Sequence, residues 1–224
     1  MIIAIDGPAG AGKSTVAREL SKRLNYKYLD TGAMYRAITF ELINRKLEDS
    51  EDLEKVFKEI IDSIELDFVD GDIVLNGRIL TKEIREPIID KHVSKAASSK
   101  VVRSFLSSEQ RKLAINSPNT ILEGRDTTTV VCPDAQVKIF LTASLDERAR
   151  RRYKELLKKD IKIDFEEVKR QIEKRDKSDT TREIGPLKVA EDAVVIDSTE
   201  KDVEWVVDKI FSLVRNKRKQ LEYN

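Results

Sequence analysis

The chain has almost none of the side chains that form disulfides or bind zinc. Its 224 residues include one cysteine, Cys132, and one histidine, His92. A single cysteine cannot form an internal disulfide, and one histidine with one cysteine cannot supply a zinc-binding cluster. Any bound metal should therefore be held by oxygen atoms. Cys132 lies in an apolar stretch, where packing is its expected role.

The chain also lacks an excess of charge of either sign and a long apolar run. Its 42 Lys and Arg residues balance 41 Asp and Glu residues, which leaves a formal net charge of +1. No overall field would therefore draw the molecule onto nucleic acid or a membrane. It shows neither a charged-then-apolar leader nor an apolar run of about 18 residues. We expect a cytoplasmic, monomeric protein that binds neither nucleic acid nor a membrane.

One motif dominates what is present. Residues 7–14 match the pattern GxxxxGK[ST], and they stand between a predicted buried strand at 2–5 and a predicted helix at 14–24. In this context the backbone N–H groups surround phosphate oxygens, Lys13 reaches the outer phosphates, and the hydroxyl of Ser14 binds Mg²⁺. The residues predicted to hold the nucleotide are Gly7, Pro8, Ala9, Gly10, Ala11, Gly12, Lys13, Ser14 and Thr15.

The order of the apolar segments predicts the fold class. Further strands are expected at 26–29, 120–122, 137–141 and 193–196, and helical stretches separate them. This alternation is typical of a doubly wound α/β fold with a central parallel sheet flanked by helices, in which the first strand is central. Two other regions, 41–62 and 88–116, are predicted to be helical. Between them, residues 64–80 alternate with period two and turn at 70–72 and 76–77, which predicts an inserted antiparallel hairpin unit.

Polar side chains follow two of the predicted strands. Thr31 comes directly after the second strand, where it can cap a helix that contains Arg36. The third strand ends in Glu123-Gly124-Arg125-Asp126. An acidic residue at this edge of the sheet can orient Mg²⁺ through water, and we assign that role to Glu123. Arg125 and Asp126 are expected to point into the cleft beyond the strand ends.

Scattered arginines favour a phosphotransferase over other proteins with a phosphate loop. The Asn-Lys-x-Asp and Asp-x-x-Gly motifs of GTP-dependent switches do not occur. An enzyme that joins two polyanions needs arginines around the loop, and Arg148 and Arg152, four residues apart, share one face of a predicted helix. Two alternatives stay open: a kinase for another small acceptor such as UMP, AMP or shikimate, and a phosphate-loop ATPase or nucleotide-dependent binding module.

At these residues the chain resembles the bacterial cytidylate kinases. The matching segments are IDGPAGAGKST, LDTGAMYR, EGRDTTTVV with the following PDAQVKIFL, ERARRR and KRDKSDTTR. With the helical stretch that holds Ser94 and Arg103, they span nearly the whole chain. The resemblance implies a P-loop NTPase fold with a core at 1–40, 100–146 and 184–224, a monophosphate-binding insert at 41–99 and a helical lid at 147–183.

The resemblance also implies an activity, ATP-dependent phosphorylation of CMP and dCMP, with ATP and Mg²⁺ as cofactors. It assigns the catalytic roles to Lys13, Arg125, Arg148 and Arg152, and the metal to Ser14 and Glu123. It assigns the cytosine to Ser94, Arg103 and Asp126 with Thr31 close by, the acceptor phosphate to Arg36, Arg125 and Arg182, and the ribose to Arg175 and Asp179. Cytosine presents an N4 donor beside the N3 and O2 acceptors, which complements a carboxylate flanked by donors.

The chain departs from the family pattern at two positions. Thr128 stands where the family usually has glycine, and Glu123 stands where aspartate is common. Glu123 reaches one methylene further than aspartate, and neither change removes a charge.

Overall fold

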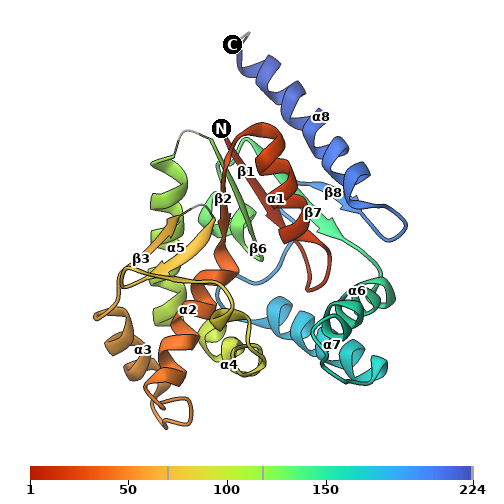
Figure 1. The fold of residues 1–224 in the computed structure, drawn as a ribbon. Coiled ribbons are helices and arrows are strands. Elements are labelled where there is room, and N and C mark those ends of the chain that lie inside the picture. The colour runs from red at the N-terminus through yellow and green to blue at the C-terminus, as the bar shows by residue number, and fades with distance from the viewer. Residues whose placement is uncertain (70, 118, 223–224) are drawn as a thin grey trace.

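A parallel sheet of five strands is the framework of the protein, in the order β2-β6-β1-β7-β8 (Figure 1). The computed structural model describes residues 1–69, 71–117 and 119–222. All neighbouring strands in this sheet run parallel, and β1 is the middle one, which confirms the predicted fold class and the central place of the first strand. The strands are β1 (Ile2–Asp6), β2 (Lys27–Asp30), β6 (Thr120–Gly124), β7 (Val137–Thr142) and β8 (Val194–Asp197).

Helices cover both faces of the sheet because alternate strand side chains are apolar on both sides. From β1, Ile3 and Ile5 pack toward one face and Ala4 toward the other. The first face is covered by α1 (Lys13–Leu24) and α8 (Val203–Glu222), and the second by α2 (Thr31–Asn44) and α5 (Lys100–Ile115) (Figure 1). No helix in the described part of the chain has both the length and the apolar composition needed to cross a membrane.

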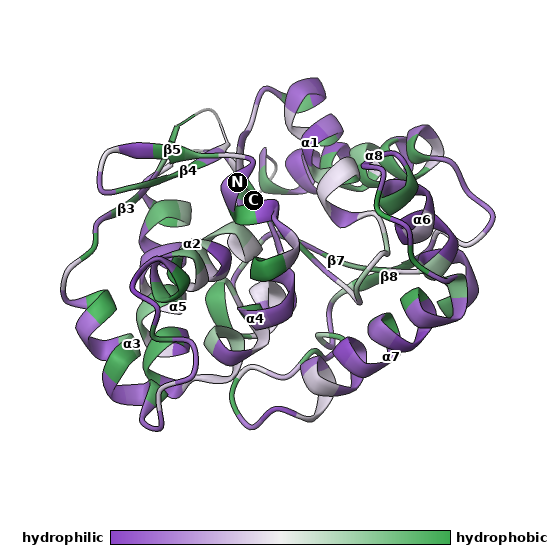
Figure 2. Cartoon of the chain, turned by 60° about the horizontal axis from the view of Figure 1, so that its bottom comes forward, coloured by the Kyte–Doolittle hydropathy of each residue, from purple (hydrophilic) through white to green (hydrophobic). Residues whose placement is uncertain are grey.

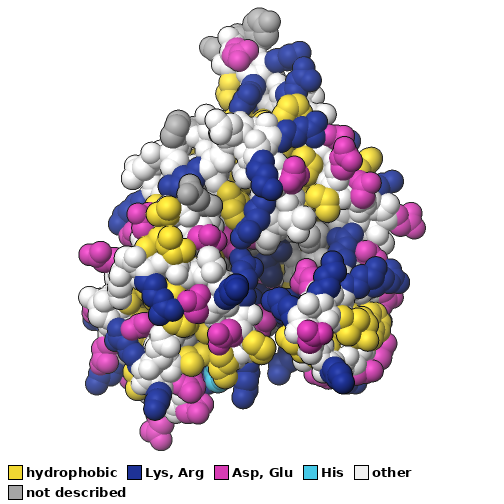
Figure 3. Space-filling model, in the orientation of Figure 1, with side chains coloured by type: hydrophobic (Ala, Val, Ile, Leu, Met, Phe, Trp, Pro, Cys, Tyr) yellow, Lys and Arg dark blue, Asp and Glu magenta, His cyan; other side chains and the backbone are white. Residues whose placement is uncertain are grey.

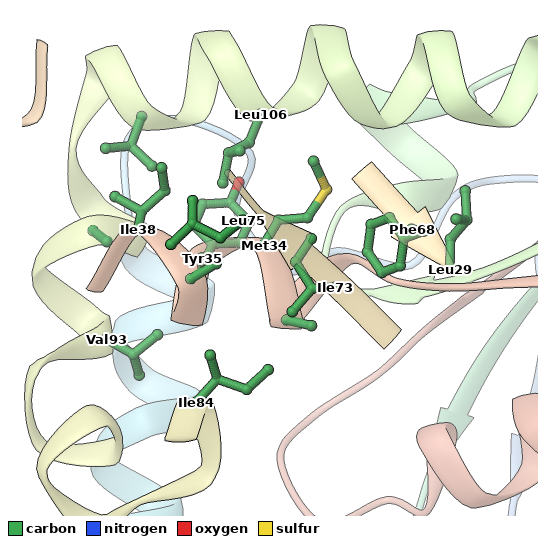
Figure 4. Close-up of a cluster of buried hydrophobic side chains, with 14 of the residues drawn as sticks. Leu29, Met34, Tyr35, Ile38, Phe68, Ile73, Leu75, Ile84, Val93 and Leu106 are labelled. Carbon is green, nitrogen blue, oxygen red and sulfur yellow. The ribbon is translucent and has the colours of Figure 1, made fainter. Parts of the chain in front are cut away.

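The second sheet is the predicted antiparallel unit. It contains β3 (Leu66–Val69), β4 (Asp72–Leu75) and β5 (Arg78–Leu80). The turn at Asn76-Gly77 has φ values of 49° and 76°, as a two-residue hairpin turn requires. Asp70, in the other predicted turn, lies outside the described residues. Figure 4 shows Phe68, Ile73 and Leu75 packed beside Met34 and Tyr35, so the second sheet and α2 share one core.

The structure corrects both long helices predicted around this sheet. The stretch at 41–62 is broken, because α2 ends at Asn44 and α3 (Leu53–Ile61) begins after Asp52, whose carboxylate caps it. The stretch at 88–116 is broken at Ser99, which is extended (φ −67°, ψ 130°) and accepts a hydrogen bond from the Val102 N–H. The remaining elements of the insert are η1 (Glu83–Arg85) and α4 (Pro87–Ser98).

The pair α6 (Leu145–Leu157) and α7 (Phe165–Thr181) packs around a small apolar cluster. Ala149, Leu156, Val168 and Ile172 form a separate apolar cluster, and the rings of Tyr153 and Phe165 meet edge to face at 5.8 Å. Much of the rest of this pair is hydrophilic (Figure 2). The same cluster includes Ala9 of the phosphate loop, so the pair packs as a helical hairpin against that loop.

Candidate active site

The phosphate loop lies between β1 and α1 and is tightly enclosed. Gly7, Gly10 and Gly12 all have positive φ, at 153°, 77° and 91°. A Cβ atom on Gly7 would lie 1.9 Å from the Leu141 carbonyl oxygen, and one on Gly10 would lie 3.0 Å from the Arg148 Cβ. Side chains at Gly7 would therefore break the contact between the loop and β7.

Lys13 is folded back onto the loop. Its side chain is buried, and its Nζ donates a hydrogen bond of 2.9 Å to the Pro8 carbonyl. Burial, and then the charge of Arg125, lower the pKa of Lys13 to about 7. A nucleotide phosphate would stabilise the charged form of this amine, so the loop is poised to bind an anion.

Ser14 and Glu123 bring two oxygen atoms together beside the loop. The Ser14 hydroxyl donates a hydrogen bond of 2.5 Å to Glu123 Oε1, and the Tyr28 hydroxyl donates one of 3.2 Å to the same atom. Burial raises the pKa of Glu123, and Asp30 adds to this effect. A divalent cation bound there would stabilise the ionised form of Glu123. In the described ranges no group of three or more His, Cys, Asp or Glu residues could hold a metal by itself. The pair therefore fits a hard cation that takes its other ligands from phosphate and water.

Asp6, which the sequence analysis did not single out, anchors the turn after β6. This fully buried carboxylate accepts hydrogen bonds from the N–H groups of Thr127 (3.0 Å) and Thr128 (2.7 Å) and from their hydroxyls (2.8 and 2.6 Å). These bonds hold the start of the short π-helical segment η2 (Thr127–Val131) against the end of β1. Arg125 and Asp126 are thereby fixed at the carboxyl edge of the sheet. Thr128, the departure from the family pattern, supplies one of the two hydroxyls.

We expect Thr128→Val to lower the free energy of unfolding by about 1–3 kcal/mol, because it removes a donor to a buried carboxylate. Urea unfolding measures the change. Thr129→Val is the matched control, since the buried Thr129 hydroxyl has no hydrogen-bond partner among the described residues. Equal losses in the two variants would contradict the role given to Thr128.

Arginines and carboxylates alternate along the cleft beyond β6. One carboxylate oxygen of Asp126, Oδ2, is paired with Arg103. The other, Oδ1, lies 3.7 Å from Arg182 Nη2. Arg182 Nη1 donates to Asp179 at 3.4 Å, and Arg125 Nε donates to the same carboxylate at 2.7 Å. Five residues predicted to contact the acceptor are thus brought into one network.

Gly185 covers the buried end of this network, and the sequence analysis missed it. Its φ is 57°, and a Cβ atom there would lie 2.3 Å from both Arg103 Nη2 and Asp126 Oδ2. Arg103 also lies over the ring of Tyr35, 5.5 Å from its centroid. The backbone at Gly185 therefore closes over the ion pair, where a larger residue does not fit.

Arg148 attaches the α6–α7 pair to the phosphate loop. Its guanidinium donates to the carbonyls of Ala9 and Ala143, each at 3.0 Å, and pairs with Asp176 of α7. The other oxygen of Asp176 accepts a hydrogen bond of 3.0 Å from the Ala9 N–H. Asp176 was not predicted as a site residue, although its carboxylate accepts a hydrogen bond from a backbone N–H of the phosphate loop.

Arg36, Arg152 and Arg175 line the other part of the cleft. Arg36 and Arg152 both donate to Asp90 of α4, a second carboxylate that the sequence analysis missed. Arg175 makes no side-chain hydrogen bond or ion pair with the described residues. Arg175 is exposed, yet desolvation by neighbouring groups, and then the charge of Arg125, lower the pKa of Arg175 to about 10. Figure 3 shows Lys and Arg gathered in a hollow between the two lower lobes.

In the described part of the chain, three of the predicted site residues, Thr31, Ser94 and Thr15, make no side-chain hydrogen bond to the arginine–carboxylate network. Thr31 does not cap α2, because the helix already begins at Thr31; the N-cap residue is Asp30, whose carboxylate accepts a hydrogen bond of 3.0 Å from the Ala33 N–H. The Thr31 hydroxyl instead donates to the Glu123 carbonyl at 2.7 Å, so it remains beside the site. Ser94 and Thr15 are exposed, and neither side chain hydrogen-bonds to a described residue.

Comparison with known proteins gives one consistent family. A family model described as cytidylate kinase matches residues 3–216. A cytidylate kinase from Thermosipho africanus is 50% identical over 217 residues, with 97% of this chain and 96% of the relative covered. One from Carboxydothermus hydrogenoformans is 49% identical over 223 residues, with 97% and 98% covered. Among solved structures, an uncharacterized protein from Eubacterium ventriosum has a TM-score of 0.54 at 15% identity, covering 96% of this chain and 98% of that one, a likeness of fold alone.

Proposed function

The chain belongs to the cytidylate kinase family, and we propose that the cleft between β6, α4 and the α6–α7 pair holds both nucleotides of its reaction. The enzyme transfers the γ-phosphoryl group of ATP to CMP or dCMP, giving ADP and CDP or dCDP. The observation that carries the assignment of the cleft is the network of Arg103, Asp126, Arg182, Asp179 and Arg125 directly beside the phosphate loop.

The phosphate loop forms the donor half. Residues 7–14 would surround the ATP phosphates with N–H groups, and Lys13 would exchange the Pro8 carbonyl for a phosphate oxygen. Ser14 and Glu123 would hold Mg²⁺, which neutralises charge on the phosphates when bound. Thr15 is exposed in the first turn of α1, within the same loop-to-helix junction.

The arginine–carboxylate network forms the acceptor half. Asp126 would accept from the cytosine N4 amino group, with Arg103 and Ser94 as donors and Thr31 nearby; uracil would present an oxygen to that carboxylate. The residues proposed for the acceptor phosphate are Arg36, Arg125 and Arg182, and those proposed for the ribose are Arg175 and Asp179. The acceptor phosphate is already ionised, so the reaction needs no general base. The arginines position it and screen its charge.

The α6–α7 pair, residues 147–183, would serve as the lid over a core of 1–40, 100–146 and 184–224, with 41–99 as the monophosphate-binding insert. Arg148 and Arg152 would bring positive charge to the transferring group as the lid closes, and closure would exclude the water that hydrolyses ATP. The apolar cluster that joins α6 to α7 supports movement of the two helices together, with Ala9 as its only member from the phosphate loop among the buried residues of the cluster.

We extend the proposal to the compartment, oligomeric state and partners of the enzyme. The enzyme would act on small nucleotides as a cytoplasmic monomer. The balanced charge supports the expectation that it binds no nucleic acid, and the single buried cysteine fits a reducing compartment.

A panel of acceptors tests the proposal. With Mg·ATP, we expect ADP release with CMP and dCMP, and release slower by about tenfold or more with UMP and GMP, because uracil and guanine present an oxygen to Asp126 where cytosine presents an amino group. AMP should also be slower, because adenine carries an amino group but is a larger, two-ring base. A coupled assay of ADP formation measures each rate. Fastest release with another nucleotide would contradict the base assignment. Equal release without any acceptor would show an ATPase instead.

A further inference from the structure

One carboxylate joins two arginines that belong to different parts of the cleft. Asp90 Oδ1 accepts a hydrogen bond of 2.6 Å from Arg36 Nη2, and Asp90 Oδ2 accepts one of 2.9 Å from Arg152 Nη2. Arg36 comes from α2, Asp90 from α4 and Arg152 from α6. Arg36 is further held by a bond of 3.0 Å to the Ile84 carbonyl. The Asp90 side chain is 29% exposed, so the bridge is largely shielded from water.

The bond between Asp90 and Arg152 connects α4 to α6 across the cleft. Among the described residues, the bond between Asp90 and Arg152 is the only hydrogen bond or ion pair that joins residues 41–99 to residues 147–183. Figure 1 shows α4 on one side and α6 with α7 on the other. Closure of the α6–α7 pair toward the insert therefore depends, for polar contact, on this one carboxylate.

The charges around Asp90 explain why a carboxylate is needed there. Arg36, Arg152 and Arg175 carry like charges into a small volume, where they repel one another. Burial by itself would raise the pKa of Asp90, but the charge of Arg36, with Arg152 and Arg175, holds the pKa of this carboxyl below its ordinary value. Asp90 is therefore ionised at neutral pH, and it offsets part of the repulsion.

We propose that Asp90 is a positioning residue that couples the acceptor site to lid closure, by holding Arg36 and Arg152 on one carboxylate. The proposal rests on the function assigned above to those arginines. A guanidinium has five N–H donors, so each arginine keeps donors for phosphate while one is bound to Asp90. Acceptor binding at Arg36 then favours the position of Arg152 over the phosphate loop, and lid closure likewise favours acceptor binding.

Asp90→Asn tests the proposal, because it keeps the shape of the side chain and removes its charge. The direct readout is synergy: the Kd of CMP is measured by calorimetry without and with a non-hydrolysable ATP analogue. In the unaltered protein the analogue should tighten CMP binding; in Asp90→Asn this gain should fall by about fivefold or more, the size of typical couplings. We also expect kcat/KM for CMP to fall by about tenfold. Glu155→Gln is the control, since it removes the other, more exposed partner of Arg152 and should keep the synergy.

A double-mutant cycle with Arg152→Ala shows whether Asp90 acts through Arg152. If it does, Asp90→Asn should change the synergy by less than about twofold once Arg152 is gone. Full additivity would overturn the proposal, as would unchanged synergy in Asp90→Asn. If Asp90→Asn fails to fold, Arg152→Gln breaks the same bridge from a half-buried position, and synergy retained there would equally overturn it. An unaltered protein without CMP-dependent ADP release would instead contradict the proposed roles of the cleft.

Discussion

Lys13→Ala should lower kcat by about 10³-fold while the protein remains folded. The buried amine lies within the phosphate loop, and its one hydrogen bond to the described residues is to the Pro8 carbonyl. That contact contributes little to the fold, whereas charge placed on the transferring phosphates acts in a shielded site, where removal of one such donor costs 10²–10³ or more in rate.

The pKa of Lys13 predicts the stability of this variant. Its folded value of about 7 lies below the ordinary value of 10.5, mainly because of burial. The unfolded chain thus binds the proton more tightly, so the amine destabilises the fold fully below pH 7, and this cost declines as the pH rises toward 10.5. Lys13→Ala should therefore be at least as stable as the unaltered protein at pH 7, with a difference that shrinks at higher pH.

Steady-state kinetics and urea unfolding at several pH values measure both effects. Lys22→Ala is the matched control, because Lys22 lies on the same helix with an exposed side chain. Near-normal turnover in Lys13→Ala would contradict the donor half of the site. A large loss of stability at pH 7 would contradict the account of its burial.

Asp126→Asn should remove most of the preference for CMP over UMP. The amide can present a donor to the uracil oxygen, whereas the carboxylate accepts from the cytosine amino group. The ratio of kcat/KM values for CMP and UMP should therefore fall by about tenfold or more. The variant should also lose stability, by up to about 3–5 kcal/mol, since Arg103 and Arg182 would lose the negative charge between them in a buried site.

The specificity ratio separates the two effects of Asp126→Asn, because unfolded protein lowers both rates equally. Asp134→Asn is the control: it also neutralises a carboxylate paired with an arginine, but on the surface. It should change neither the ratio nor, to any large extent, the stability. An unchanged ratio in Asp126→Asn would place base recognition elsewhere in the cleft.

Local signals in the sequence predicted the framework well. The five strands of the parallel sheet are short apolar runs, and the Asn76-Gly77 turn is a strong hairpin signal. The phosphate loop could be predicted because its glycines, Lys13 and Ser14 act within one short segment. Motifs that end strands, such as Glu123 to Asp126, were also placed correctly, because parallel strands bring their carboxyl ends to one edge.

What could not be predicted depends on partners far apart in the chain. Asp6 meets Thr128 across 122 positions, and Asp90 meets Arg152 across 62. Among 41 acidic residues, neither carboxylate has a local pattern that distinguishes it from a solvated one. Gly185 gave no signal either, because its need for a small residue comes from Arg103 and Asp126. The helix breaks at Asp52 and Ser99 carried a capping signal that the periodicity obscured.

The most direct test of the account is a crystal structure of the complex with CMP and ADP. The account predicts the cytosine N4 atom within hydrogen-bond distance of Asp126, and the CMP phosphate among Arg36, Arg125 and Arg182. It also predicts that Lys13 turns from the Pro8 carbonyl to the ADP phosphates. A cytosine bound away from Asp126, or a CMP phosphate that contacts none of these arginines, would contradict the site proposed for this cytidylate kinase.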